Sequence, residues 1–130
     1  MLIGAGNVSF STPYDVGKVY VVFGKLPNYS DLILSSFTAG TSGFYVSGPL
    51  TTSSPWLGKK CSRGWLGDVN GDDIDDFAVS AYLYSALGRA NAGAVWVIYG
   101  KASTDTVVNY NLTNSLGSGG IQVYILFLLW

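Results

Sequence analysis

The sequence contains an internal repeat, and such a repeat constrains the fold because each unit must bury its apolar faces against its neighbours. The segment Val16–Lys25 recurs as Ala92–Lys101, and Gly17 aligns with Gly93 at an offset of 93 − 17 = 76. The similarity extends back to residues 2–5 and 78–81. With one residue of slippage, it also extends forward to residues 40–46 and 117–123. The chain therefore holds about one and two-thirds repeats, starting in mid-repeat.

Each repeat predicts strands rather than helices. Val19–Phe23 and Val95–Tyr99 are continuous apolar runs flanked by Gly, which is typical of strands buried on both faces. Residues 77–81 are a further good candidate, and residues 44–47 and 61–66 are weaker ones. The 17 Gly, the 15% aromatic content and only 4 Pro favour an all-β chain with many tight turns. Four strands in each repeat indicate the blades of a β-propeller, which stack radially.

The strongest local signal is acidic. Five of the eight acidic residues lie within the segment from Gly67 to Phe77. Clustered carboxylates repel one another unless a cation neutralises them. Oxygen-bearing side chains alternate at Asp68, Asn70 and Asp72, and Gly71 between the last two favours a turn. Because Ca²⁺ takes about six to eight oxygen ligands, we expect the Ile74 carbonyl and a carboxylate from Asp76 or Asp75 to complete the set.

Two alternatives to this calcium loop can be weighed from the sequence. An EF-hand requires Gly at its sixth position and an acidic residue at its twelfth, but Asp73 and Val79 stand there when Asp68 is the first. The EF-hand hypothesis therefore fails. A solvated acidic turn without a metal remains open, because Asp73 stands where calcium loops usually prefer Gly.

The order of these features resembles the FG-GAP repeat of integrin α-subunit β-propellers. The resemblance rests on Leu57-Gly58, the acidic loop, the strand after it and the Gly93–Gly100 segment. It implies an all-β fold of four-stranded antiparallel blades forming an incomplete propeller. Residues 1–56 would be the latter part of one blade with a connecting loop, and residues 57–130 would be a second blade with the calcium loop and an atypical apolar tail. It also implies a structural Ca²⁺ ion with ligands from Asp68, Asn70, Asp72, Ile74 and Asp76. In this resemblance Asp75 braces the loop instead of binding the ion.

The resemblance also implies partners. Other blades of a larger propeller would pack on this chain, and a protein or glycan ligand would bind the loops opposite the calcium loop, at residues 6–16 and 82–92. In the second loop, Tyr82, Tyr84 and Arg89 are candidate contact residues because Tyr and Arg anchor many interfaces. The alternative is that both tyrosines pack against a neighbouring blade and that Arg89 is solvated.

Composition excludes several classes of function. A net charge of −1 without a basic cluster argues against nucleic acid or an anionic membrane as a partner. The chain lacks His and holds a single Cys, Cys61, so we expect no catalytic constellation and no enzyme activity. The apolar end of the chain, residues 121–130, is shorter than the roughly 20 residues that span a bilayer.

Sequons at Asn7, Asn28 and Asn111 mildly favour a secreted glycoprotein. The predicted function is therefore an extracellular, calcium-binding propeller module for adhesion or ligand binding. The alternative is a non-catalytic accessory propeller of a secreted enzyme, such as a phospholipase or a polysaccharide-active protein. Flanking sequence would separate the two.

Overall fold

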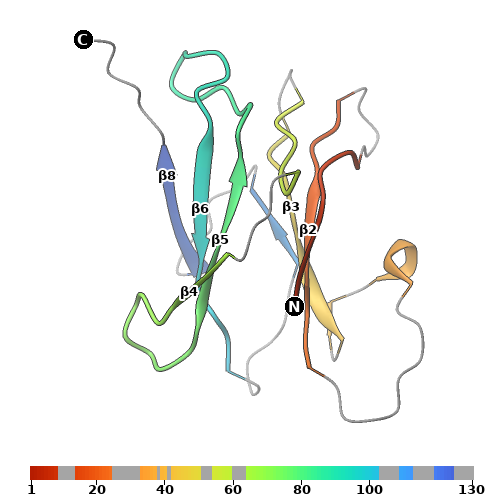
Figure 1. Ribbon diagram of the computed structural model, residues 1–130, viewed down its shortest axis with the longest axis vertical. Helices are drawn as coiled ribbons and strands as arrows, with labels where there is room; N and C mark the ends of the chain where they lie inside the picture. Colours follow the sequence, from red (N-terminus) through yellow and green to blue (C-terminus); the bar gives the residue numbers. More distant parts are fainter. Residues whose placement is uncertain are drawn as a thin grey trace.

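The computed structural model describes residues 1–8, 14–24, 33–37, 39–40, 42–50, 54–59, 64–102, 109–112 and 119–124. These residues form two four-stranded sheets that lie side by side, and one short 3-10 turn is the only helical element among them (Figure 1). The first sheet has the order β1-β2-β3-β7 and the second β4-β5-β6-β8. The all-β prediction is confirmed. The elements are β1 Leu2–Ala5, β2 Lys18–Val22, η1 Leu34–Ser36, β3 Gly43–Ser47, β4 Trp65–Gly67, β5 Asp76–Ala81, β6 Ala94–Ile98, β7 Tyr110–Asn111 and β8 Gly120–Tyr124.

The two sheets share one strand register, as the internal repeat predicts. In the first sheet β1 runs antiparallel to β2, with Leu2 opposite Val21. In the second sheet β5 runs antiparallel to β6, with Ala78 opposite Val97. The second pair follows the first at the offset of the repeat, since 78 − 2 and 97 − 21 are both 76. The sequence repeat is therefore also a structural repeat.

The one-residue slippage in the repeat is also present in the structure. Val19 in β2 lies opposite Val46 in β3, and Val95 in β6 lies opposite Val123 in β8. Val19 and Val95 are separated by the repeat offset, 95 − 19 = 76. Val46 and Val123 are separated by one residue more, 123 − 46 = 77. The connection before β8 therefore carries one extra residue, and the pairing itself is unchanged.

One strand pair departs from the predicted antiparallel blades. β7 runs parallel to β3, with Val46 opposite Tyr110, so the connection between β6 and β8 reaches back to the first sheet. The Tyr45 amide donates to Asn109 Oδ1 at 2.9 Å, and the Leu112 amide donates to the Ser47 carbonyl at 3.1 Å. The outer edge of β3 would otherwise expose unpaired backbone groups, and β7 supplies their partners.

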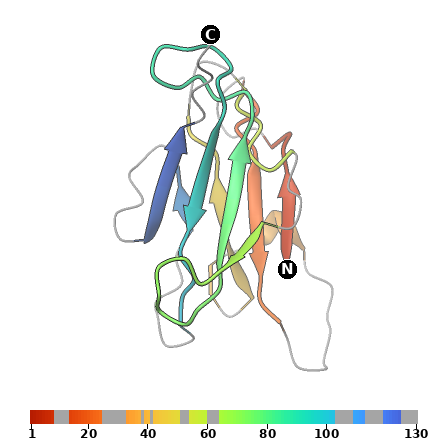
Figure 2. The same ribbon diagram turned by 60° about the vertical axis from the view of Figure 1, so that its left-hand side comes forward.

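The core lies between the two sheets. Figure 2 shows the strands of both sheets from a second direction. The Phe44 ring of β3 lies 6.1 Å from the Phe77 ring of β5, centroid to centroid. Leu57 is buried between the sheets, where its amide donates to the Val16 carbonyl at 3.1 Å. Burial of such side chains contributes about 1.5–3 kcal/mol each, which holds the sheets together. The core comprises Val19, Val21, Phe44, Val46, Leu57, Phe77, Val79, Ala81, Ala94, Trp96, Ile98 and Leu112.

Within the described residues, no helix has the length and apolar character needed to cross a membrane. The tail predicted to be too short for a span lies partly outside the described residues, from position 125 onward.

Candidate metal site

The acidic loop, residues 68–75, joins β4 to β5 at the lower end of the second sheet (Figure 1). The next connection, residues 82–93, joins β5 to β6 at the upper end. Antiparallel strands place successive connections at opposite ends of a sheet. The loop predicted to bind calcium and the loop predicted to contact a partner therefore lie at opposite ends of the same sheet.

Asp68 organises the acidic loop through its carboxylate. Its Oδ1 accepts hydrogen bonds from the amides of Gly71 at 2.6 Å and Asp72 at 3.0 Å, and its Oδ2 accepts one from the Asp73 amide at 2.8 Å. The Asp73 amide, with smaller contributions from the neighbouring amides, holds the pKa of Asp68 below its ordinary value. Gly71 and Asp73 adopt positive φ angles of 82° and 64°, so Asp73 takes the left-handed backbone that Gly adopts most readily.

Asn70 and Asp72 extend this network. The Asp72 amide also donates to Asn70 Oδ1 at 3.1 Å, and Asn70 Nδ2 donates to Asp72 Oδ2 at 2.9 Å. Asp72 Oδ1 accepts a hydrogen bond from the Ile74 amide at 3.0 Å. The side chains of Asp68, Asn70 and Asp72 therefore converge on one turn of backbone, as their alternate spacing predicts. All three residues are exposed to solvent.

Asp76 differs from these three residues because it is the buried first residue of β5. It is 0% exposed, and its two carboxylate oxygens each accept a backbone hydrogen bond at 2.8 Å. Oδ2 accepts from the Val69 amide, and Oδ1 accepts from the Gly100 amide just after β6. Asp75, which the sequence interpretation gave the bracing role, is exposed. In the structure the brace is Asp76, which ties the start of the loop to the end of β6.

Residues 66–98 match the family model of the FG-GAP repeat. This FG-GAP segment runs from the second residue of β4 to the last residue of β6 and includes the whole acidic loop. FG-GAP repeats typically occur in extracellular proteins or ectodomains. Comparisons with curated proteins and with solved structures gave no match.

The FG-GAP segment fits a hard cation in its donor chemistry. Its loop presents only oxygen donors, and Ca²⁺ and Mg²⁺ prefer oxygen ligands. The carboxylates of Asp68, Asp72 and Asp76 nevertheless do not form one cluster, because within the described residues no three acidic, Cys or His side chains gather closely enough to hold a metal. Asp76 remains a predicted ligand, since a carboxylate offers about four lone-pair sites and its backbone bonds use two.

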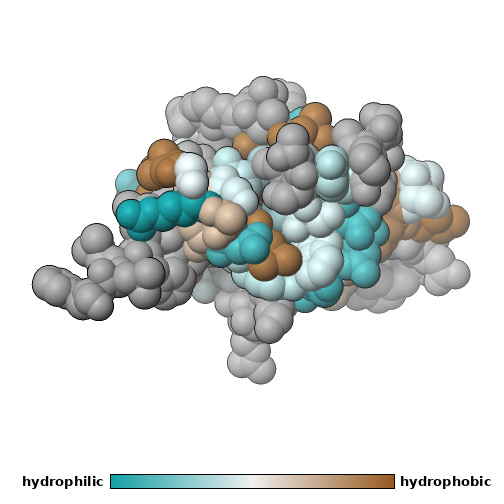
Figure 3. Space-filling view, turned by 90° about the horizontal axis from the view of Figure 1, so that it is seen from above, coloured by the Kyte–Doolittle hydropathy of each residue, from teal (hydrophilic) through white to brown (hydrophobic). Residues whose placement is uncertain are grey.

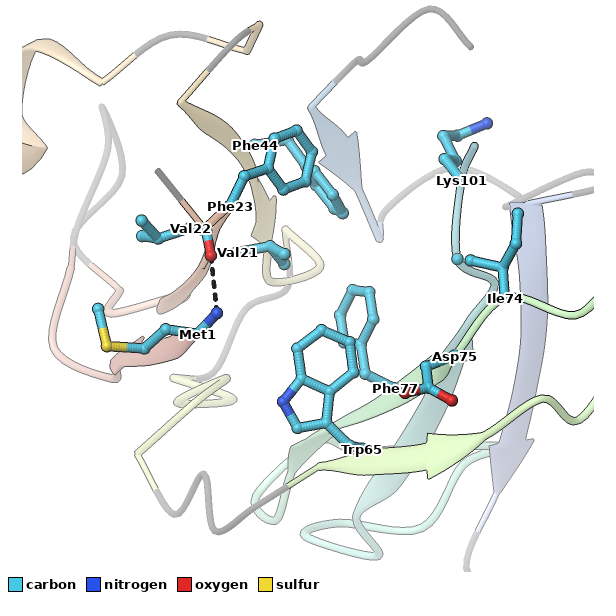
Figure 4. Close-up of a pocket in the computed structure, with 12 residues that line it drawn as sticks. Met1, Val21, Val22, Phe23, Phe44, Trp65, Ile74, Asp75, Phe77 and Lys101 are labelled. Carbon is cyan, nitrogen blue, oxygen red and sulfur yellow. Dashed lines mark hydrogen bonds between the residues drawn. The ribbon is translucent and has the colours of Figure 1, made fainter. Parts of the chain in front are cut away.

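A cleft of about 340 Å³ opens between the sheets at the same end as the acidic loop of the FG-GAP segment (Figure 4). Apolar and aromatic side chains from both sheets line it, and Asp75 and Lys101 stand on the side of the second sheet. The Trp65 and Phe77 rings lie 5.8 Å apart on the wall formed by the second sheet. Ile74 links the cleft to the loop, because it belongs to both. The main aromatic lining residues are Phe23, Phe44, Trp65 and Phe77.

The candidate contact residues in the upper loop of the FG-GAP segment have different surroundings. Tyr84 packs on the buried Trp96, with ring centroids 5.5 Å apart, so its main contact is with the core. Tyr82 is exposed on one side, and its other side lies against Trp56 at 5.9 Å. Arg89 is exposed, and its amide donates to the Ala86 carbonyl at 2.9 Å, which closes the tip of the loop.

Sequence reasoning missed two residues at this upper end. Trp56 has a φ angle of 53°, unusual for a residue of its size, and the Nζ atom of Lys59 lies 3.3 Å from the centroid of its ring. Neither residue belongs to a periodic pattern in the sequence, so no signal marked them as site residues. Viewed from above in Figure 3, this end of the molecule is a mosaic of hydrophilic and hydrophobic patches.

Of the three sequons, Asn7 lies exposed in a turn after β1, and Asn111 lies exposed in β7. Asn28 lies outside the described residues, as does Cys61.

Proposed function

We propose that this chain is a calcium-binding β-propeller repeat module that acts outside the cell in adhesion or ligand binding, in the manner of integrin α-subunits. The observation that carries this proposal is the FG-GAP segment at residues 66–98, with its converging side chains of Asp68, Asn70 and Asp72. The main-chain carbonyl of Ile74 and the carboxylate of Asp76 complete the proposed ligand set.

The proposed ion has a structural role. A bound cation would neutralise carboxylates that share one short loop. Asp76 already ties the loop, through the Val69 amide, to Gly100, which lies two residues after β6. Stiffening the loop would therefore stiffen the lower end of the second sheet and leave the upper loops to contact a partner.

The proposed partner is a protein or a glycan that binds the upper loops. Tyr82 and Arg89 are the exposed members of the candidate set. Trp56 lies against Tyr82, and the Lys59 ammonium lies over the Trp56 ring. Aromatic faces beside a cation suit both protein side chains and sugar rings. Tyr84 supports this surface indirectly, because it positions the loop against Trp96. We propose a binding role and no catalytic one.

Isothermal titration of Ca²⁺ into the chain tests the metal proposal. Asp72→Asn and Asp75→Asn make the same change in charge, but only Asp72 belongs to the proposed ligand set. We expect calcium-selective binding, with Mg²⁺ much weaker, that Asp72→Asn reduces at least tenfold and Asp75→Asn leaves nearly unchanged. Absence of binding by a folded chain would refute the calcium site. Equal losses in the two variants would instead indicate diffuse attraction by an acidic loop.

A further inference from the structure

A groove of about 330 Å³ lies at the outer edge of the first sheet. It is formed by β3, by the residues just after β3 and by β7, which is the last strand of that sheet among the described residues. We call it the side groove, and it shares no lining residue with the cleft between the sheets. Its volume is within the range of small-ligand sites, about 300–1,000 Å³. Its main lining residues are Tyr45, Ser47, Leu50, Asn109, Tyr110 and Asn111.

Asn111 stands at the side groove with its side chain directed away from the core. The Tyr110 ring packs on the Phe44 ring, with centroids 5.7 Å apart, and Leu112 belongs to the core. Successive residues of a strand point to opposite sides, so Asn111 points away from the second sheet. Asn111 is exposed to solvent, whereas Leu112 is buried. The side-chain amide of Asn111 is therefore accessible from the solvent side of the groove.

The other walls of the side groove combine aromatic, apolar and amide groups. The Tyr45 amide donates to Asn109 Oδ1 at 2.9 Å, which holds the Asn109 side chain beside Tyr45. Because Oδ1 is engaged, the Nδ2 group of Asn109 is the part that can donate to a ligand. Leu50 adds apolar surface and is 49% exposed. A sugar ring suits such a groove, because its C–H groups pack on apolar and aromatic side chains and its oxygens accept hydrogen bonds from amides.

The sequence at this position is an acceptor for exactly such a ring. Asn111 begins the triplet Asn111-Leu112-Thr113, which fits the acceptor sequence for N-linked sugars. Thr113 lies outside the described residues and enters the argument only through the sequence. The side groove therefore lies beside the atom to which a sugar would be joined.

We propose that Asn111 carries an N-linked glycan whose first sugar, an N-acetylhexosamine, lies in the side groove. In this modification, the Nδ2 atom of Asn111 forms a bond to C1 of an oligosaccharide carried on a lipid diphosphate. The bond between C1 and the diphosphate oxygen breaks, and the lipid diphosphate leaves with the electron pair. Nδ2 gives up one proton to a base of the transferring enzyme, and nothing is oxidised or reduced.

The inference rests on the extracellular location in the proposed function, because N-linked sugars are added during secretion, and it is independent of calcium. It also has a consequence for the edge of the sheet. β7 pairs with β3 along one side, and its other side is the end of the first sheet within the described part of the chain. Edge strands recruit other chains, and a glycan held beside β7 would hinder such pairing.

Secretion of the full chain from a eukaryotic host, behind a cleavable secretion signal, tests whether Asn111 is modified. An N-glycosidase converts each glycosylated Asn to Asp, and peptide mass spectrometry in heavy-oxygen water identifies the converted positions. We expect Asn111 to be converted in most chains. Thr113→Ala removes the acceptor triplet but keeps Asn111, so it should abolish conversion. Thr113→Ser keeps the triplet and serves as the matched control.

The other two sequons separate failure of this inference from failure of the proposed function. Conversion at Asn7 or Asn28 with Asn111 bare would overturn the inference and leave an extracellular module standing. A secreted chain that is bare at all three positions would overturn it as well. The calcium titration uses protein without sugars, so its result is independent of both outcomes.

Contact between the sugar and the side groove is tested in a chain with Asn7→Gln and Asn28→Gln, where Asn111 is the remaining acceptor. An endoglycosidase trims the glycan to one sugar, and urea unfolding compares this protein with its Thr113→Ala counterpart. We expect the one-sugar protein to unfold at a higher urea concentration. Equal midpoints would refute the contact.

A substitution in the groove locates this gain. Leu50→Ser should reduce the difference in urea midpoint between the one-sugar and sugar-free proteins, because it removes apolar surface from the groove. Leu87→Ser is the control, since Leu87 is 67% exposed in the loop 82–93 and does not line the groove. It should leave the difference unchanged. A gain that survives Leu50→Ser, or that both variants reduce equally, would contradict a sugar bound in the side groove.

Discussion

The Asp76 carboxylate accepts a hydrogen bond of 2.8 Å from the Gly100 amide, although the two residues are 24 positions apart. The bond connects the first residue of β5 to the segment that follows β6. A second bond of equal length, from the Val69 amide, brings in the acidic loop. The buried Asp76 side chain therefore joins three segments, which are the start of β5, the acidic loop and the residues that follow β6.

Asp76→Ala should destabilise the chain by about 2–4 kcal/mol, because two backbone amides lose their acceptor where water has little access. Urea unfolding in EDTA measures this loss without any contribution from a metal. Asp75→Ala is the control, and it should change the free energy of unfolding by less than about 0.5 kcal/mol because Asp75 is exposed. Similar losses in the two variants would show that Asp76 is not the brace.

Gly17 and Gly93 occupy equivalent positions in the two repeats, with φ angles of 77° and 80°. A methyl group on Gly17 would lie 2.2 Å from the Leu57 carbonyl oxygen, whereas the nearest atom to one on Gly93 would be 3.4 Å away. Gly93→Ala should therefore lower the free energy of unfolding by about 1–2 kcal/mol, because alanine is strained in the left-handed backbone conformation. Gly17→Ala should cost about 1–3 kcal/mol more, because the backbone of Leu57 must move. Thermal or urea unfolding of both variants tests the difference, and equal costs would argue against close packing of Leu57 on Gly17.

Tyr84→Ala and Tyr82→Ala should separate packing from binding. Tyr84 is partly buried against Trp96, so its truncation should cost about 2–3 kcal/mol of folding free energy. Tyr82 is more exposed, and its truncation should cost less than about 1 kcal/mol. Unfolding curves give both values. A reversed order would place Tyr84, and not Tyr82, on the surface available to a partner.

Asp68 should titrate at a lower pH in the folded chain than in the urea-unfolded chain. Three loop amides bond to its ionised form, and so the folded-state pKa is depressed. This contribution to stability is complete above the unfolded pKa of about 3.9 and is lost as the pH falls through the folded value. Carboxyl carbon NMR in EDTA measures both midpoints, and coincident midpoints would mean that the amide bonds do not persist in solution.

The repeat made most of the fold predictable. Its offset of 76, and the slip to 77, recur in the strand pairing of the two sheets, because side chains alternate along strands and register is set by the buried face. β7 was not predictable in the same way. Two residues are too short to show a periodic pattern, and their partner strand lies far away in the sequence.

The sequence predicted which residues belong to the candidate metal site better than it predicted how their side chains are arranged. Asp68, Asn70 and Asp72 converge as their spacing indicated. The different surroundings of Asp75 and Asp76 depended on which side of β5 faces inward, and adjacent strand residues point to opposite sides. Packing of β5 against β6 determines which of its sides faces inward. The acidic motif alone carries no information about that packing.

The parallel pairing of β7 with β3 has a consequence for synthesis of the chain. The Tyr45 amide donates a hydrogen bond to Asn109, which lies 64 residues later in the chain. The outer edge of β3 therefore has no partner strand until much of the second repeat has been synthesised. Contacts of this range slow folding, and an unpaired edge strand readily pairs with other chains. Interruption of translation between the two repeats would therefore release a species with a free edge at Gly43–Ser47, and such an edge is prone to aggregate.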